Sequence, residues 1–265
     1  MPKTRLDTEL LNRSLAPSRE KAQALIMAGE VRVDGVPARK PGQAVGEGTQ
    51  IEVAAALPFV SRGGQKLEKA ITEFSIDLTG AICADIGAST GGFTDCMLQH
   101  GAAQVTAIDV GYGQLDWRLR SDPRVTVRER ANARYMEPDW FAAPLSFAAV
   151  DVSFISLALI LPPLLPCLAE DGRVVALIKP QFEAGRAEVG KNGVVRDPAV
   201  HARVCEAVMR MADGVGYAIL NLTYSPIVGP KGNREFLLYL QKRGTKNVAS
   251  CPDFVVLAGN VVVKS

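Results

Sequence analysis

The sequence predicts an α/β protein in which a small α+β unit precedes a large, mostly parallel sheet. Two observations lead to this prediction. Between residues 61 and 241, short apolar segments typical of buried strands alternate with longer segments of helical periodicity. The last two apolar segments, 217–224 and 235–241, are joined by a connection rich in proline and glycine instead of a helix. We therefore expect the final strand to run antiparallel to the others.

The small unit at the start of the chain is predicted to hold two helices and short strands. Apolar side chains recur at helical spacing in segments 6–11 and 22–27, and Gly29 ends the second helix. Residues 31–33 and 49–53 read as strands. The predicted divisions of the chain are residues 1–53, a linker at 54–60, a large domain at 61–243, and a tail at 244–265. We consider two alternatives for the tail, an additional strand and a mobile end.

The large domain is predicted to contain seven strands and five helices. The expected strands cover residues 82–86, 104–109, 125–129, 147–152, 173–178, 217–224 and 235–241. The expected helices begin near Arg62, Gly91, Leu115, Ser156 and Pro198. Residues 152–169 carry no charged side chain, and this stretch is long enough to consider a membrane span. Three prolines interrupt it, so we expect a turn and a buried helix instead.

Composition narrows the class of protein. With 48% apolar and 22% charged residues, the chain is typical of a soluble globular protein, and a net charge of +2 does not by itself indicate nucleic acid. The five cysteines are widely spaced without a C-x-x-C pair, which favours a reducing compartment over a disulfide framework. With only two histidines, no metal site is expected. The first residues form no apolar signal segment, and we expect a cytoplasmic location.

A glycine-bearing loop between the first strand and its helix is the most informative feature of the chain. Gly87, Gly91 and Gly92 allow a ligand to approach the backbone at the start of a helix. Asp85 precedes the first glycine by two residues, where it would attract a cation and repel a pyrophosphate. Asp109 ends the next strand, where a βαβ nucleotide site binds ribose hydroxyls. The loop predicts a nucleoside-cofactor site; a dinucleotide site and a glycine turn without cofactor are the alternatives.

This loop resembles motif I of the S-adenosylmethionine-dependent methyltransferases, whose cofactor carries an ammonium, a sulfonium and a carboxylate group. The resemblance implies a Rossmann-like methyltransferase sheet with an antiparallel last strand, and S-adenosyl-L-methionine as the cofactor. On this basis the expected cofactor-binding residues are Asp85, Gly87, Ser89, Thr90, Gly91, Gly92, Phe93, Asp109, Val110 and Asn132.

Four charged residues are expected to meet at the same edge of the sheet. Asp151 and Lys179 end the fourth and fifth strands, and Glu235 begins the antiparallel last strand. Lys66 lies on the helix before the first strand, although Lys69 is only one turn away. Open α/β sheets bind ligands at the carboxyl ends of their strands. We therefore expect a catalytic cluster here, while solvated charges at strand ends remain the alternative.

The same four residues match by position the Lys-Asp-Lys-Glu tetrad of ribose 2′-O-methyltransferases that resemble the heat-shock rRNA methyltransferase. This resemblance implies that Lys179, in its neutral form, accepts the proton of a ribose hydroxyl. Methyltransferases that act on nitrogen commonly carry an Asn/Asp-Pro-Pro-Tyr sequence after the fourth strand. This chain has Val152, Ser153 and Phe154 after Asp151, which favours oxygen as the acceptor.

The N-terminal unit is expected to bind RNA. Residues 1–40 contain eight lysines and arginines against five acidic residues, so charge alone also fits a mixed, solvated surface. The segments 5–7, 18–22 and 26–35 resemble the small RNA-binding domain of the S-four type. The resemblance implies RNA contacts from Lys3, Arg5, Arg19, Lys21 and Lys40.

Taken together, these motifs resemble the TlyA family of rRNA 2′-O-methyltransferases, also labelled haemolysins, over nearly the whole chain to residue 243. The family implies methyl transfer to cytidine riboses of ribosomal RNA within ribosomal subunits. Because the sequence shows no clean membrane span and no basic amphipathic helix, we expect no stable membrane association. Residues 57–60 differ from the arginine and tryptophan of some relatives. Two other functions remain open: a membrane-active haemolysin-like protein, and a non-catalytic RNA-binding factor for ribosome assembly.

Overall fold

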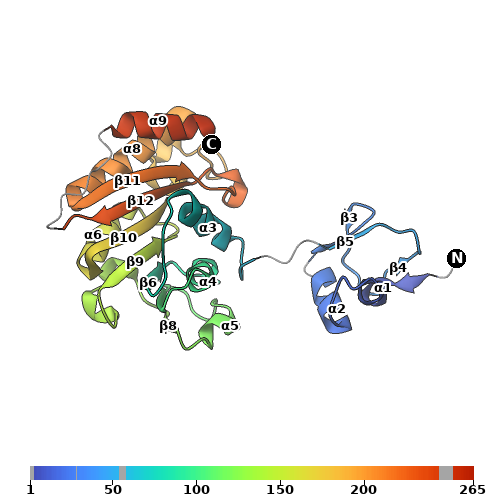
Figure 1. Cartoon of the computed structure of the whole chain (residues 1–265). Helices are drawn as coiled ribbons and strands as arrows, with labels where there is room; N and C mark the ends of the chain where they lie inside the picture. Colours follow the sequence, from blue (N-terminus) through green and yellow to red (C-terminus); the bar gives the residue numbers. More distant parts are fainter. Residues whose placement is uncertain (1–2, 28, 54–57, 245–252) are drawn as a thin grey trace. The chain divides into compact units, whose positions relative to one another are not determined.

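The computed structural model describes residues 3–27, 29–53, 58–244 and 253–265. The chain divides into two compact units, Met1–Leu57 and Pro58–Ser265 (Figure 1). Residues 54–57 of the expected linker lie outside the described part. Residues 58–60 of that linker belong to the second unit, because Phe59 is buried there and Val60 N donates to Asp95 Oδ2 at 2.7 Å.

The N-terminal unit combines two helices with two small sheets. Its elements are β1 (Thr4–Arg5), α1 (Leu6–Asn12), α2 (Arg19–Met27), β2 (Val31–Val33), β3 (Val36–Pro37), β4 (Ala44–Val45) and β5 (Ile51–Val53). β1 pairs with β4, and the other sheet has the order β3-β2-β5. Leu6 and Leu10, one helical turn apart, are fully buried together with Ala22 and Ile26. The predicted helices and strands are therefore present, packed around one small core.

The large unit contains one sheet of seven strands in the order β11-β12-β10-β9-β6-β7-β8. The strands are β6 (Ile82–Ile86), β7 (Gln104–Ile108), β8 (Val125–Arg128), β9 (Leu145–Val150), β10 (Leu168–Ile178), β11 (Tyr217–Tyr224) and β12 (Phe236–Lys242). β12 is antiparallel to both β10 and β11, between which it lies. The other neighbouring pairs are parallel. The predicted fold class, including the antiparallel last strand, is confirmed.

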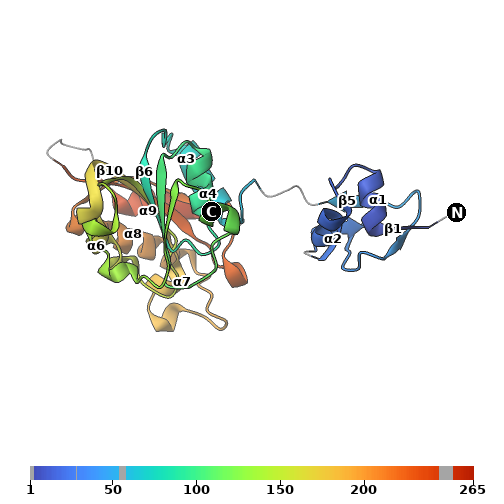
Figure 2. The ribbon, with the colours of Figure 1, turned by 90° about the horizontal axis from the view of Figure 1, so that it is seen from below.

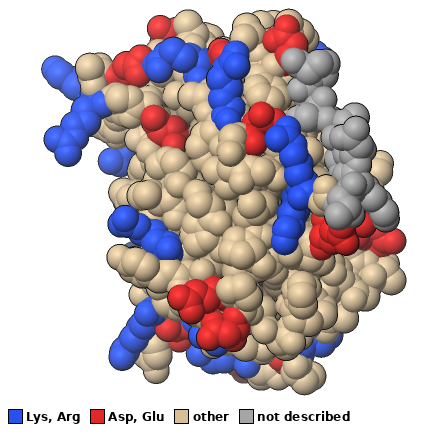
Figure 3. Space-filling model, turned by 90° about the vertical axis from the view of Figure 1, so that its left-hand side faces the viewer, with Lys and Arg blue, Asp and Glu red and all other residues tan. Residues whose placement is uncertain are grey.

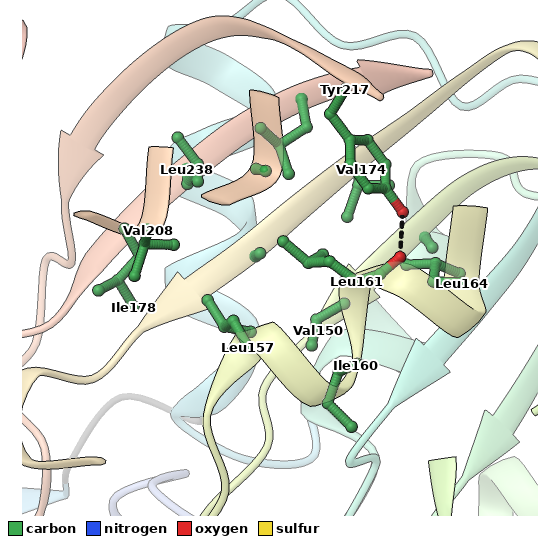
Figure 4. Close-up of a cluster of buried hydrophobic side chains, with 14 of the residues drawn as sticks. Val150, Leu157, Ile160, Leu161, Leu164, Val174, Ile178, Val208, Tyr217 and Leu238 are labelled. Atoms are coloured by element: carbon green, nitrogen blue, oxygen red, sulfur yellow. Dashed lines mark hydrogen bonds between the residues drawn. The ribbon is translucent and has the colours of Figure 1, made fainter. Parts of the chain in front are cut away.

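Helices cover both faces of this sheet. They are α3 (Gly63–Glu73), α4 (Gly92–Gln99), α5 (Trp117–Arg120), α6 (Leu161–Leu164), α7 (Pro180–Glu183), α8 (Pro198–Val215) and α9 (Phe254–Lys264). A hydrophobic core lies on each face of the sheet, and side chains of β10 alternate between the two. Val174 and Ile178 belong to the core under α6, α8 and α9. Leu177 belongs to the core under α3 and α4. In the first core, the Tyr217 hydroxyl donates to the backbone oxygen of Leu161 at 2.8 Å (Figure 4).

The uncharged segment after β9 forms short helical turns instead of one long helix. The segment forms a 3₁₀ turn at Leu157–Leu159, then α6, then a second 3₁₀ turn at Leu165–Cys167. Leu157, Leu161 and Leu164 pack into the core (Figure 4). Among the described residues, no helix combines the length and the apolar composition that crossing a membrane requires.

The end of the chain corrects a prediction. Residues 254–264 form helix α9, which lies beside α8 and β11 (Figures 1 and 2), so neither an additional strand nor a mobile end is correct for them. Asp253 caps the helix by accepting from Val255 N and Val256 N. Ala258 and Val262, one turn apart, are buried. This packing overrides the strand preference of the valines.

Charged side chains show no single-sign cluster on the face of the large unit seen in Figure 3. Among the described residues, basic and acidic groups there surround a broad uncharged area and alternate in sign. This face therefore lacks the basic stripe by which nucleic-acid-binding surfaces are recognised.

Candidate active site

Two loops meet at the carboxyl edge of the sheet, one after β6 and one after β9. Gly87 follows β6 with a φ of +87°. A Cβ at this position would lie 2.5 Å from the backbone oxygen of Asp151, which follows β9. Only a glycine permits both this conformation and this close approach. The approach brings Asp85 and Asp151 to one cavity.

Two cavities adjoin at this edge and form one cleft. A cavity of about 240 Å³ is lined by Asp85, Gly87, Ser89, Thr90, Gly92 and Phe93 together with the four expected catalytic residues. A cavity of about 340 Å³ is lined by Gly87, Ser89, Asp109, Val110 and Asn132. Gly87, Ser89, Asp151 and Ser153 line both. Nine of the ten residues expected to bind the cofactor thus lie along one cleft.

Asp85 is a buried carboxylate at the wall of the smaller cavity. Its Oδ2 accepts from the backbone N and the hydroxyl of Thr94, at 2.8 and 2.7 Å. Its Oδ1 has no hydrogen-bond partner among the described residues. Burial raises the pKa of Asp85 to about 7, against the hydrogen bonds from Thr94, which lower it. A buried carboxylate with one oxygen unpaired is suited to a cationic group of a ligand.

Gly91 is the one expected cofactor residue that the structure places elsewhere. A Cβ there would meet the side chains of Leu119 and Leu115, at 2.3 and 2.7 Å, and not the cavity. Its φ of +94° is what requires glycine. A Cβ at Gly92 would meet Ser61 Oγ at 2.4 Å, because the starts of α3 and α4 touch there. The expectation that Gly91 clears space for the ligand is therefore not supported by its surroundings.

Asp109 is oriented by two backbone amides at the larger cavity. Its Oδ2 accepts from Ser89 N at 2.8 Å, and its Oδ1 accepts from Gly111 N at 2.7 Å. The side chain of Asn132 accepts from Arg134 N at 3.1 Å and so caps a 3₁₀ turn beside the same cavity. Each carboxylate oxygen of Asp109 keeps a second lone pair, which is the arrangement expected for binding a ribose hydroxyl pair.

The four expected catalytic residues form one ion-pair chain. Lys179 Nζ lies 2.5 Å from Asp151 Oδ1, and Lys66 Nζ lies 3.5 Å from Asp151 Oδ2. Lys66 Nζ also lies 2.7 Å from Glu235 Oε2. Lys66, Lys179 and Glu235 are buried, with 8%, 8% and 2% of their surface exposed. The structure thus brings together one residue of α3 and the residues next to the ends of β9, β10 and β12, up to 169 positions apart in the sequence.

Lys66 and Lys69, one turn apart on α3, differ in their surroundings. Burial lowers the pKa of Lys66, but the carboxylates of Asp151 and Glu235 outweigh it, so the net pKa is raised. Lys66 therefore stays charged at neutral pH. Lys69, the alternative one turn away, donates to the backbone oxygen of Tyr224 at 2.8 Å and faces outside this cluster. Of the two lysines, Lys66 is the one that contacts Asp151 and Glu235.

Three side chains at the cleft were not predicted from the sequence. The hydroxyl of Ser153 accepts from Lys179 Nζ at 2.9 Å. Ser61, at the start of α3, lines the smaller cavity. Phe154 is 90% exposed with a φ of +62°, and its ring lies 5.0 Å from that of Phe182. Serine and phenylalanine at these positions give no sequence signal, because their roles come from contacts across loops.

The basic residues expected to bind RNA are exposed on the N-terminal unit. Arg5 and Arg19 both bond to the buried carboxylate of Asp7, at 2.9 and 3.2 Å. Hydrogen bonding from Arg5 holds the pKa of Asp7 well below its usual range, although burial opposes it. Asp7 therefore fixes two half-exposed guanidinium groups side by side. Lys3, Lys21 and Lys40 are exposed as well.

One group of possible metal ligands occurs in the described part of the chain. Glu68, Cys96 and His100 place their ligand atoms within 4.8 Å of one another. His100 Nε2 lies 2.6 Å from Glu68 Oε2, and Cys96 Sγ donates to the same oxygen at 3.7 Å. These contacts already account for the cluster as a polar link between α3 and α4.

The sequence matches two known families. Residues 59–242 match the FtsJ-like methyltransferase family, and residues 4–51 match the S4 domain. The 16S/23S rRNA (cytidine-2′-O)-methyltransferase TlyA of Mycobacterium tuberculosis is 48% identical over 241 residues, which cover 90% of each chain. Hemolysin A of Brachyspira hyodysenteriae is 43% identical over 236 residues, which cover 89% of this chain and 98% of that protein.

A solved structure agrees with these matches. A candidate hemolysin from Streptococcus thermophilus has 46% identity and a TM-score of 0.77, covering 100% of this chain and 96% of that one. Both predicted domains are therefore matched by family, by sequence and by structure. The chain belongs to the TlyA family of FtsJ-like methyltransferases, with an S4 domain before the methyltransferase domain.

Proposed function

We propose that this enzyme transfers a methyl group from S-adenosyl-L-methionine to the 2′-oxygen of a cytidine ribose in ribosomal RNA. One observation carries the proposal: the chain Lys179–Asp151–Lys66–Glu235 lies at one end of a cleft whose other end holds Asp109. The name of the M. tuberculosis relative supports cytidine and ribosomal RNA as the target. A cytoplasmic location with ribosomal subunits as the substrate agrees with that target.

The two cavities suit the two ends of this cofactor. The larger one offers Asp109 to a ribose and the apolar side chains of Ile108 and Ile160 to a base. The smaller one offers the unpaired oxygen of buried Asp85 to an ammonium group. When bound there, S-adenosylmethionine would supply an electrophilic methyl group. Asp85, Asp109 and the loop Gly87–Gly92 would hold it in place.

The two lysines of the ion-pair chain, Lys66 and Lys179, have different tasks in the proposed reaction. Lys66 contacts two carboxylates and has a raised pKa, so it remains an ammonium group. Lys179 contacts one carboxylate, shared with Lys66, and the hydroxyl of Ser153. Lys179 is therefore the better acceptor for the proton of a ribose hydroxyl, and it must be neutral when it acts. Asp151 holds Lys179 in place while it does so.

Two further features suit an RNA substrate. The exposed ring of Phe154, packed against Phe182 next to Lys179, offers a flat apolar surface on which a base could stack. On the N-terminal unit, the guanidinium groups of Arg5 and Arg19 are held by Asp7 in a fixed pair, which suits adjacent phosphate groups.

The test is methyl transfer from radiolabelled S-adenosylmethionine to isolated ribosomal subunits. We expect label on ribosomal RNA, at a site where the backbone resists alkaline cleavage, because a 2′-O-methyl group removes the attacking hydroxyl. The control is Lys179→Ala with unchanged cofactor binding and little transfer. Label on a base, or no label on either subunit, would contradict the proposal.

A further inference from the structure

The connection between β11 and β12 contains a glycine whose position is explained by a catalytic side chain. Gly229 has φ −68° and ψ 177°, a backbone conformation that any residue can adopt. Yet a Cβ at this position would lie 2.3 Å from Glu235 Oε1 and 2.9 Å from Glu235 Cδ. The backbone conformation therefore does not require glycine here; an added Cβ would instead compete with the Glu235 carboxylate for the same space.

The connection is fixed from two sides so that it cannot simply move away. Gly229 N donates to the backbone oxygen of Asn233 at 2.8 Å, which closes a tight loop. The buried side chain of Asn233 accepts from Val195 N at 3.1 Å and donates to the backbone oxygen of Gly193 at 2.9 Å. Asn233 thus joins the loop that precedes Glu235 to the segment that follows β10, the strand after which Lys179 lies.

We propose that Gly229 and Asn233 are positioning residues that hold the Glu235 carboxylate against Lys66, an inference that rests on the proposed methyl transfer. Glu235 Oε2 lies 2.7 Å from Lys66 Nζ, and Glu235 Oε1 occupies the space that a Cβ on residue 229 would take. A Cβ at residue 229 would displace the carboxylate by about 1 Å, because a carbon and an oxygen that are not bonded stay about 3 Å or more apart. The end of a glutamate side chain moves more easily than the backbone, so the ion pair breaks while the fold persists.

The test is the single-turnover rate of methyl transfer by Gly229→Ala in the full-length enzyme. We expect a fall of about 100-fold, the loss typical of a 1 Å misplacement at a reacting centre. The matched control is Gly214→Ala, where an added Cβ has no neighbour within 4 Å, and its rate should equal that of the wild type. A loss below about threefold for Gly229→Ala would overturn the inference.

A double-mutant cycle separates positioning from a general structural effect. In a Glu235→Ala background no carboxylate remains to be displaced, so Gly229→Ala should cause no additional loss. If the two losses multiply, Gly229 acts by another route and the inference is wrong.

Asn233→Ser provides a second variant that adds no Cβ contact; we expect a lower rate with unchanged S-adenosylhomocysteine affinity. The wild-type enzyme in the same assay tests the proposed function separately. No methyl transfer by the wild type would contradict the proposed function, whereas normal transfer by both the wild type and Gly229→Ala would contradict only this inference.

Discussion

The proton on Asp85 should make cofactor binding depend on pH. This carboxyl group is buried and has a pKa of about 7. A ligand ammonium beside its unpaired Oδ1 favours the ionised form, so binding should release a proton. About one Asp85 in eleven is ionised at pH 6 and about half at pH 7, so affinity should rise roughly fivefold, or about 1 kcal/mol.

Calorimetric titration with S-adenosylhomocysteine measures this effect, because the ligand keeps the ammonium group and does not react. We expect about half a proton to be released per ligand at pH 7 and nearly one at pH 6, seen by comparing buffers of different ionisation enthalpy. Asp85→Asn should bind more weakly and lose this dependence on pH. Asp109→Asn is the matched control: it should weaken binding by ~1–3 kcal/mol yet keep the dependence. Equal affinities of the wild type at pH 6 and pH 7, without proton release, would refute the reasoning.

Three further predictions concern catalysis and the N-terminal unit. Lys179→Ala should bind cofactor normally but transfer methyl groups at least ~100-fold more slowly in single-turnover assays; near-normal rates would exclude it as the base. A chain beginning at Pro58 should bind S-adenosylhomocysteine as the full-length protein does, yet fail to methylate ribosomal subunits, and full methylation would show that the S4 domain is dispensable. Because the pKa of Asp7 is lowered on folding, its carboxylate stabilises the N-terminal unit at neutral pH, and this contribution is lost as the pH falls below about 4. The N-terminal unit of Asp7→Asn should therefore be less stable than that of the wild type at pH 7. Its stability, measured by circular dichroism, should fall less than that of the wild type between pH 7 and pH 3.

Local sequence signals were sufficient for much of the sheet. β6 and β11 have the predicted bounds, because a glycine or a proline lies within two residues of each end of both strands. β10 begins five residues earlier than predicted, at Leu168, which pairs with Leu145 of β9 across an irregular stretch. That extension depends on a neighbouring strand, and α9 depends on burial of Ala258 and Val262. Neither can be read from periodicity alone.

Some residues of the site can be predicted from the local sequence, whereas others depend on contacts between segments that are distant in the sequence. Asp85, Asp109 and the four charged catalytic candidates could be predicted, since each is a charged residue placed at a strand end or on the helix before the first strand by the order of elements. Ser153, Gly229 and Asn233 could not, because their contacts join loops that are distant in sequence. Gly91 belongs to the loop pattern, yet only the structure shows that it faces Leu115 and Leu119.

The place of β12 has a consequence for how the protein is made. This strand is the last of the sheet to leave the ribosome, yet it inserts between β10 and β11, which are synthesised earlier. Glu235 directly precedes β12, so its contact with Lys66 depends on the insertion of this strand. β12 pairs with β11 across a short connection, whereas its partners on β10 are 58 to 68 positions away in the sequence. Non-local pairing of this second kind forms slowly. An emerging chain can therefore complete its S4 domain before its methyltransferase centre, because that centre needs the carboxylate of Glu235 directly before β12.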